Sequence, residues 1–214
     1  MLSGVYFNNN EILYNNGQNI VKICDKSDIK LIGMHNIANV CAALSAVVDL
    51  VDINTVKEVL NTFYGVEHRM EFVRNVSGVN YYNDSIASSP TRTIAGLVSF
   101  DKKVILIAGG YDKHIPYDPI GGYILDKVKL LILVGDTSSK IREAVIKEAK
   151  NRKENLDEIL EIKEFSNLKD CVMYAKSKAK DGDDIVMSPA SASFDMYKDF
   201  EQRGNYFKEI VKEL

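Results

Sequence analysis

Five short polar clusters hold the residues of this chain whose types and spacing could bind a ligand. The most informative is Tyr81–Pro90, where Asn-Asp-Ser ends a β-prone segment just before a helix that Pro90 would begin. Proteins of the α/β class place ligand-binding groups at such positions. The other four clusters are Gly33–Asn39, His68–Glu71, Gly109–Lys113 and Ser188–Phe194.

The cluster Gly33–Asn39 offers two amide side chains on one helix face. Asn36 and Asn39 are three residues apart, so on a helix both could meet the edge of an adenine base. A simpler interpretation is that Asn36 only caps the helix. His35 is interpreted as a hydrogen-bonded structural residue, because no cysteine or carboxylate lies near it at metal-ligand spacing.

Two charged residues suit a nucleotide. Arg69 follows a predicted hinge, where a guanidinium could grip a phosphate bidentately, although it could equally form an ion pair with Glu67 or Glu71. Asp84 could accept hydrogen bonds from ribose hydroxyls, or it could be a turn or helix-capping aspartate.

The last two clusters suit an anionic amino acid. A glycine pair, Gly109-Gly110, would let the backbone approach a ligand at the end of a strand, and Lys113 could reach into the same crevice. Ser193 and Phe194 are predicted to begin the last helix, where free N–H groups favour an anion, although Ser193 could simply be a helix cap.

The five clusters, in this order, resemble those of the Mur ligase family. The resemblance runs from about Gly33 to Leu214, and its most specific part is Ser188–Asn205, which contains Ser-Pro-Ala-Ser-Ala-Ser-Phe-Asp and Phe-Glu-Gln-Arg-Gly-Asn. This tail is most similar to the members that add D-glutamate to the cytoplasmic peptidoglycan precursor. Such members use ATP to convert UDP-N-acetylmuramoyl-L-alanine into an acyl phosphate, which the amine of D-glutamate then attacks.

The resemblance implies roles for nine residues. It implies contacts to ATP from Asn36, Asn39, Arg69 and Asp84, and a D-glutamate pocket formed by Ser88, Lys113, Ser193, Phe194 and Phe200. The chain departs from the usual family pattern at Ile86, where a lysine is common, and at Ser88 and Ser89, where threonine and asparagine are common. Arg92 is one candidate for the missing charge, with a plain helix-surface arginine as the alternative.

The family's glycine-rich phosphate loop, ending in Gly-Lys-Thr or Gly-Lys-Ser, does not occur in these 214 residues. We therefore expect them to be part of a ligase, inactive alone, with the missing N-terminal segments as partners. The magnesium ligands of the intact enzyme are expected outside this chain, and no residue here is assigned a catalytic or metal-binding role. Alternatives are a related ligase of the folylpolyglutamate synthase kind, or a non-catalytic nucleotide-binding module, which would show a Gly-x-Gly-x-x-Gly fingerprint that is absent here.

Composition gives no reason to expect nucleic acid or membrane as a partner. The net charge is -3, with 27% charged and 46% hydrophobic residues, and no run approaches the ~20 apolar residues of a membrane span. Three widely spaced cysteines, Cys24, Cys41 and Cys171, form neither a disulfide framework nor a metal site, so we expect a reducing cytoplasm.

These clusters require elements of two kinds to position them. Residues 1–30 alternate β-prone runs with Asn/Gly turns, which predicts a small antiparallel meander, followed by helices from Asn36 and from Asn54 to about Phe63. Beyond a hinge at residues 65–67, apolar strands alternate with helices, which predicts an α/β, Rossmann-like and mostly parallel sheet. The predicted strands include Val104–Ala108, Asp184–Met187 and one near Ile159–Ile162. We expect residues 1–66 to be the C-terminal portion of a Mur ligase central ATPase domain, and residues 67–214 to be an amino-acid-binding C-terminal domain.

Overall fold

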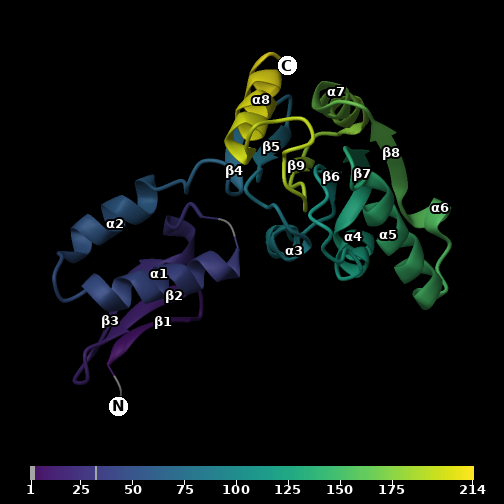
Figure 1. The fold of residues 1–214 in the computed structure, drawn as a ribbon. Helices are drawn as coiled ribbons and strands as arrows, with labels where there is room; N and C mark the ends of the chain where they lie inside the picture. Colours follow the sequence, from purple (N-terminus) through teal and green to yellow (C-terminus); the bar gives the residue numbers. More distant parts are fainter. Residues whose placement is uncertain (1–2, 32) are drawn as a thin grey trace. The chain divides into compact units, whose positions relative to one another are not determined.

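The computed structural model describes residues 3–31 and 33–214, with the side chain of His35 outside the described residues. The chain forms two compact units, Met1–Gly65 and Val66–Leu214, which are described separately (Figure 1). Within the described part, no helix has the length and apolar character needed to cross a membrane.

The first unit is an antiparallel meander covered by two helices. Its elements are β1 (Gly4–Asn8), β2 (Glu11–Asn15), β3 (Ile20–Asp25), the short η1 (Lys26–Asp28), α1 (Met34–Val47) and α2 (Ile53–Thr62). The strands pair in the order β1-β2-β3, which confirms the predicted meander. Ile37, Val40 and Leu44 recur at helical spacing on α1 and pack with Ile12 and Ile23 of the sheet in one small core.

The second unit is a doubly covered sheet. Its elements are β4 (Glu71–Val76), β5 (Val79–Asn83), α3 (Pro90–Leu97), β6 (Val104–Ala108), α4 (Ile120–Lys127), β7 (Val128–Val134), α5 (Ser138–Arg152), α6 (Leu156–Ile159), β8 (Glu161–Phe165), α7 (Leu168–Lys178), β9 (Asp184–Met187) and α8 (Phe200–Lys212). The strand order is β4-β5-β9-β6-β7-β8, with β4 antiparallel to β5 and the remaining pairs parallel. The prediction of an α/β fold with a mostly parallel sheet is confirmed.

Alternating side chains of the central strands supply a core on each face of this sheet. Leu106 of β6 belongs to the core beneath α3, α4 and α5, whereas its neighbours Ile105 and Ile107 belong to the core beneath α7 and α8. A strand that is buried on both faces has a continuous run of apolar residues, and β6 has such a sequence. Three of the five polar clusters follow the carboxyl ends of β5, β6 and β9 (Figure 1 shows these strands).

One predicted strand was misplaced. A strand was expected near Ile159–Ile162, but α6 ends at Ile159 and β8 covers Glu161–Phe165. Asn155 precedes α6, and Asp157 and Glu158 occupy its first turn, where acidic side chains favour a helix.

Candidate functional site

Three loops of the second unit meet where β5, β9 and β6 end. Because these strands are parallel neighbours, their carboxyl ends lie at one edge of the sheet. The backbone N–H of Asp84 donates to the carbonyl of Met187 at 2.8 Å, and the N–H of Gly109 donates to the carbonyl of Pro189 at 2.8 Å. Tyr111 N–H donates likewise to Ala192 O at 2.9 Å, so the three loops form one connected surface.

The glycine pair allows a close approach of backbone to backbone. Gly109 and Gly110 have φ values of 117° and 146°. A Cβ on Gly109 would lie 2.0 Å from the carbonyl oxygen of Val134, and one on Gly110 would lie 2.2 Å from that of Ala192. The backbone at the end of β7 and in the loop after β9 occupies the space that a side chain at these positions would need. The expectation that the glycines let the backbone approach a ligand stays a prediction.

Asp84 is a buried carboxylate with two internal donors. It is 4% exposed, and its Oδ1 accepts from the N–H of Met70 at 3.1 Å while Oδ2 accepts from Ser188 Oγ at 2.7 Å. Burial raises the pKa of Asp84 to about 6, although both hydrogen bonds and the charges of Arg69 and Arg92 favour its ionised form. It does not cap α3, because Ser89 occupies that position.

Arg69 is exposed and is presented by an unusual turn. His68 and Met70, on either side of it, both have left-handed backbone conformations, with φ values of 62° and 45°. Such conformations are costly for non-glycine residues and are concentrated at functional sites. The alternative that Arg69 pairs with Glu67 or Glu71 is wrong, since both carboxylates pair with Lys208 at 3.1 Å.

The expected pocket residues differ in exposure. Lys113 is exposed and Ser88 is half-buried, whereas Ser193 is 2% exposed. Phe194 is 62% exposed and lies edge-on to Tyr111, with ring centroids 5.9 Å apart. The structure thus brings the loop of Phe194 against the loop that carries Lys113.

Ser193 and Phe194 do not begin a helix. Helix α8 starts at Phe200, where Asp199 is the N-cap residue and accepts from the N–H of Gln202 at 2.7 Å. Both predictions for Ser193, an anion site at a helix start and a plain helix cap, are therefore wrong. Phe200 instead opens α8 and lies edge-on to His68, with centroids 6.0 Å apart.

The two asparagines belong to the first unit and lie on one helix face as predicted. Asn39 Nδ2 donates to Asn36 Oδ1 at 3.3 Å. The capping interpretation of Asn36 is wrong, because α1 begins at Met34 with Gly33 as its N-cap residue. Gly33 has a φ of 94°, a conformation that glycine adopts readily.

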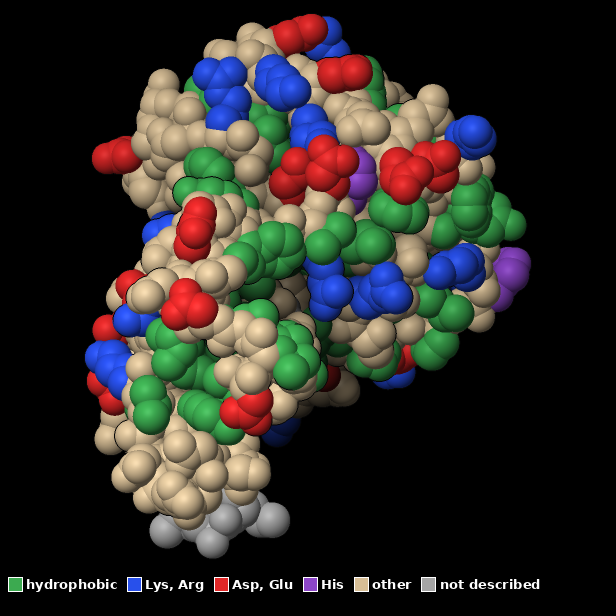
Figure 2. Space-filling view, turned by 90° about the vertical axis from the view of Figure 1, so that its left-hand side faces the viewer, with side chains coloured by type: hydrophobic (Ala, Val, Ile, Leu, Met, Phe, Trp, Pro, Cys, Tyr) green, Lys and Arg blue, Asp and Glu red, His purple; other side chains and the backbone are tan. Residues whose placement is uncertain are grey.

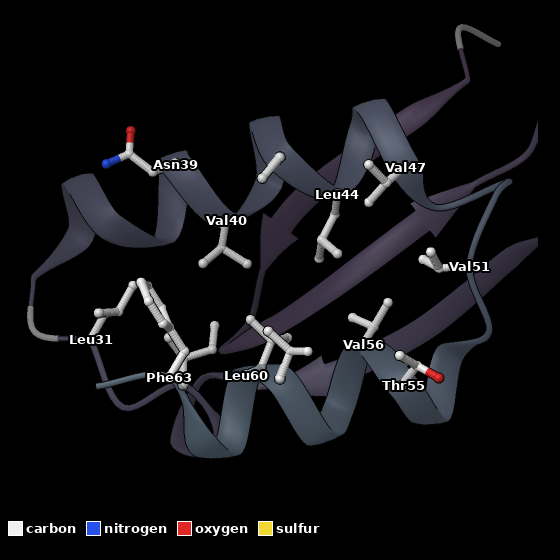
Figure 3. A pocket seen from close by; sticks show the side chains of 13 residues that line it. Leu31, Asn39, Val40, Leu44, Val47, Val51, Thr55, Val56, Leu60 and Phe63 are labelled. Carbon is white, nitrogen blue, oxygen red and sulfur yellow. The ribbon is translucent and has the colours of Figure 1, made fainter. Parts of the chain in front are cut away.

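An apolar groove of about 390 Å³ separates α1 from α2 in the same unit. It is lined by Ile29, Leu31, Asn39, Val40, Ala43, Leu44, Val47, Val51, Thr55, Val56, Val59, Leu60 and Phe63. Figure 3 shows the amide of Asn39 pointing away from the apolar side chains of α2. Val59 and Phe63 remain about half exposed, and hydrophobic side chains are visible among charged ones in the space-filling view (Figure 2). The groove is therefore mostly apolar, with Asn39 and Thr55 as the polar residues of its lining.

Arg203 is a buried residue of the site to which the sequence assigned no role. It is 4% exposed and donates to the Ser85 hydroxyl and carbonyl and to the carbonyls of Ser191 and Ala192, at 2.9–3.0 Å. Burial lowers its pKa to about 10, although the charges of Asp195 and Tyr197 oppose this. The signal in the sequence was its position on the same face of α8 as Phe207, Ile210 and Val211.

The remaining arginine of interest is Arg92, in the first turn of α3. It is exposed, and its Nη1 donates to the carbonyl of Ile86 at 3.3 Å. Among the described residues, no group of three or more His, Cys, Asp or Glu side chains could hold a metal ion.

Comparison with known proteins gives consistent matches. Over 211 residues the chain is 49% identical to UDP-N-acetylmuramoylalanine–D-glutamate ligase of Acetivibrio thermocellus, covering 99% of the chain and 45% of that protein. The corresponding protein of Clostridium botulinum is 50% identical over 214 residues, with 99% and 44% covered. The chain thus spans a little under half the length of these relatives.

A solved structure supports the fold. The folylpolyglutamate synthase of Mycobacterium tuberculosis, complexed with ADP, superposes with a TM-score of 0.60 at 13% identity, covering 98% of this chain and 47% of that one. The model of the Mur ligase glutamate ligase domain matches residues 68–191, more than half of the chain. This chain belongs to the Mur ligase family.

Proposed function

We propose that these 214 residues form part of an ATP-dependent ligase that joins D-glutamate to UDP-N-acetylmuramoyl-L-alanine in the cytoplasm, as a step of peptidoglycan precursor synthesis. The observation that carries the proposal is the near 50% identity, across almost the whole chain, to two proteins named as ligases of this kind. In this proposal the first unit is the C-terminal portion of a central ATP-binding domain and the second binds the amino acid.

The nucleotide contacts would come from four residues. The amides of Asn36 and Asn39 are close enough to present donors and acceptors together to an adenine edge. Arg69, exposed on its strained turn, would contact a phosphate. Asp84 is buried, so its role would be exerted partly through Met70, whose N–H it holds beside Arg69.

The amino-acid pocket would form along the loops after β6 and β9. Lys113 would hold one carboxylate of D-glutamate, since its ammonium is exposed and has no ion-pair partner among the described side chains. Phe194 and Phe200 would cover the apolar part of the substrate, and the Ser88 hydroxyl would add a hydrogen bond. Ser193 is 2% exposed, so we assign the second carboxylate to backbone N–H groups beside it.

In this scheme the chain orients ATP and D-glutamate. Its cationic side chains would lower the electrostatic free energy of bringing the phosphates and carboxylates together. ATP would supply the phosphoryl group that activates the muramoyl-alanine carboxylate. The rigid edge of the sheet would hold the amine of D-glutamate toward that carboxylate, because positioning accounts for much of the rate in such reactions. These 214 residues do not include a Gly-Lys-Thr or Gly-Lys-Ser loop, so we expect no ligase activity from them alone.

The two other candidate functions have less support. A folylpolyglutamate synthase is related to this chain at only 13% identity, which supports a common fold and no more. A non-catalytic nucleotide-binding module would leave the identity to D-glutamate ligases unexplained.

A chimera tests the proposal directly. The aligned 211 residues of the Acetivibrio relative would be replaced by this chain, and phosphate release would be measured with ATP and the uridine precursor. We expect the chimera to release phosphate only when D-glutamate is present. A folded chimera that is inactive, or that prefers L-glutamate or a folate substrate, would contradict the proposal; the unmodified relative is the control.

A further inference from the structure

Arg92 lies at an electrostatically unfavourable position and forms no ion pair among the described residues. It occupies the first turn of α3, which contains no acidic residue. The start of a helix carries partial positive charge, so a cation there is disfavoured unless an anion lies nearby. Arg142 and Arg152, by contrast, both form ion pairs, with Glu164 at 2.9 Å and with Asp126 at 2.6 Å.

The Arg92 guanidinium is directed to the loop after β5. Within the described residues it forms one hydrogen bond, from Nη1 to the Ile86 carbonyl at 3.3 Å, and that carbonyl also accepts from the N–H of Ser88 at 2.8 Å. The remaining N–H donors of the fork are therefore available to a ligand. Ile86 contributes no charge of its own to this loop.

The same loop holds the turn that presents Arg69. The N–H of Ile86 donates to the carbonyl of His68 at 3.1 Å, and the N–H of Met70 donates to Asp84 Oδ1 at 3.1 Å. Arg69 lies between these two anchored residues. Both guanidiniums are thus tied to a single short segment, Arg92 by its side chain and Arg69 by its neighbouring backbone.

Arg69 and Arg92 thus flank a short segment, residues 84–88, in which the one charged residue is Asp84. Asp84, the carboxylate that both arginines influence, is 4% exposed and its two oxygens already accept hydrogen bonds. Neither Arg69 nor Arg92 forms an ion pair within the described residues. Two forked guanidiniums with free donors are suited to the oxygens of a phosphate chain.

We propose that Arg92 and Arg69 together form a phosphate clamp over residues 84–88, which binds the polyphosphate chain of a nucleotide. The inference rests on the proposed use of ATP but assigns to Arg92 a contact that the family resemblance does not specify. It also explains how a loop with isoleucine at position 86 keeps a positive charge. Arg92 provides that charge from the next helix.

Binding of inorganic tripolyphosphate to the 214-residue chain tests the clamp without requiring ligase activity. Side-chain and backbone ¹⁵N signals would be followed by NMR at low ionic strength, where we expect affinity on the order of millimolar. Arg92→Gln keeps a donor for the Ile86 carbonyl but loses the charge, and should weaken binding about tenfold, as should Arg92→Ala and Arg69→Ala. Arg92→Lys should retain part of the affinity because it keeps the charge without the fork.

Arg142→Ala is the matched control, because it removes a half-buried arginine that is ion-paired with Glu164, and it should leave tripolyphosphate binding unchanged. Absence of binding to the wild-type chain, or equal binding by wild type and a folded Arg92→Gln variant, would overturn the clamp. ATP binding that ignores Arg92 would overturn the clamp while leaving the proposed ligase function intact. Tripolyphosphate binding that depends on Arg92, alongside an inactive chimera, would support the clamp and reject the ligase function.

Discussion

Arg203 holds Ser85 at two points, although 118 positions separate them in the sequence. Its Nε donates to the Ser85 hydroxyl at 3.0 Å, and its Nη2 donates to the Ser85 carbonyl at 2.9 Å. The Ser85 hydroxyl in turn donates to the carbonyl of Phe200 at 2.7 Å. Helix α8 is thereby connected to the loop that follows β5.

We expect Arg203→Met to destabilise the second unit strongly. The methionine fills similar space but leaves the carbonyls of Ser85, Ser191 and Ala192 without their charged donor in a buried region. Lost charged hydrogen bonds of this kind should reduce the free energy of unfolding by about 3 kcal/mol or more. Urea denaturation measures this. Arg142→Met, which removes an exposed ion pair, should cost about 1 kcal/mol or less, and equal costs for the two variants would contradict the prediction.

The raised pKa of Asp84 predicts a specific dependence of stability on pH. Between an unfolded pKa of about 4 and the folded value of about 6, the folded chain keeps a proton that the unfolded chain releases. The contribution of Asp84 to the free energy of unfolding is therefore fully present below about pH 4 and is lost as the pH rises to about 6. Two pKa units correspond to roughly 3 kcal/mol.

Asp84→Asn isolates this contribution, because the amide can keep a bond to the N–H of Met70 but does not ionise. Carboxylates with lowered pKa values, such as Asp112 and Asp126, act in the opposite direction in both proteins and cancel in the difference. The stability of wild type relative to Asp84→Asn should fall between pH 4 and pH 7 in urea titrations. A difference that is constant, or rises with pH, would show that Asp84 is ionised normally.

Gly204 permits α8 to pack against the turn before β4, so Gly204→Ala should be harmful. The added Cβ would lie 2.2 Å from Nδ1 of the buried His68 ring and 3.1 Å from Nδ2 of Asn83. Overpacking of this kind costs about 1–3 kcal/mol. Gly122→Ala is the matched control in a helix, since the atoms nearest to its Cβ belong to the flexible side chains of Arg152 and Glu148. In thermal melts, the melting temperature of Gly204→Ala should lie well below that of wild type, whereas that of Gly122→Ala should lie near it.

Lys113→Ala should raise the KM of the chimera for D-glutamate and leave its KM for ATP unchanged. Losing one charge-assisted contact should raise the KM for D-glutamate about tenfold to a hundredfold. The nucleotide contacts proposed for Asn36, Asn39 and Arg69 would remain. Steady-state kinetics with each substrate varied distinguishes the outcomes. A raised KM for ATP with an unchanged KM for D-glutamate would reassign Lys113 to the phosphates.

A fragment of residues 66–214 should fold without the first unit. It contains both large hydrophobic cores, whereas the first unit has one small core. A chain of about 150 residues buries close to 70% of its unfolded surface, which is enough for an independent domain. We expect a dispersed NMR spectrum and a single cooperative melting transition. A molten fragment would show that the first unit is required.

The strands and most helices could be predicted because local patterns define them. The apolar runs Val104–Ala108 and Asp184–Met187 are strands with the predicted bounds. The start of α8 could not be predicted, because the loop before it is stabilised by distant donors, such as Arg203 bonding to the carbonyl of Ala192. Helical propensity after Ser193 does not contain that information.

The position of the site at the strand ends could also be predicted, since parallel strands bring their carboxyl ends to one edge. The exposure of its members could not. Asp84 and Ser193 are polar residues in loops, yet they are 4% and 2% exposed because segments far away in the sequence pack over them. The roles proposed for the nine site residues remain predictions.

The strand order has a consequence for biosynthesis. β9, which spans Asp184–Met187, lies between β5 and β6 in the middle of the sheet, although it is the last strand to leave the ribosome. Until it emerges, β5 and β6 have no partner between them, and the two halves of the sheet cannot join. We therefore expect nascent chains that stop before residue 184 to expose unpaired strand edges and to depend on chaperones.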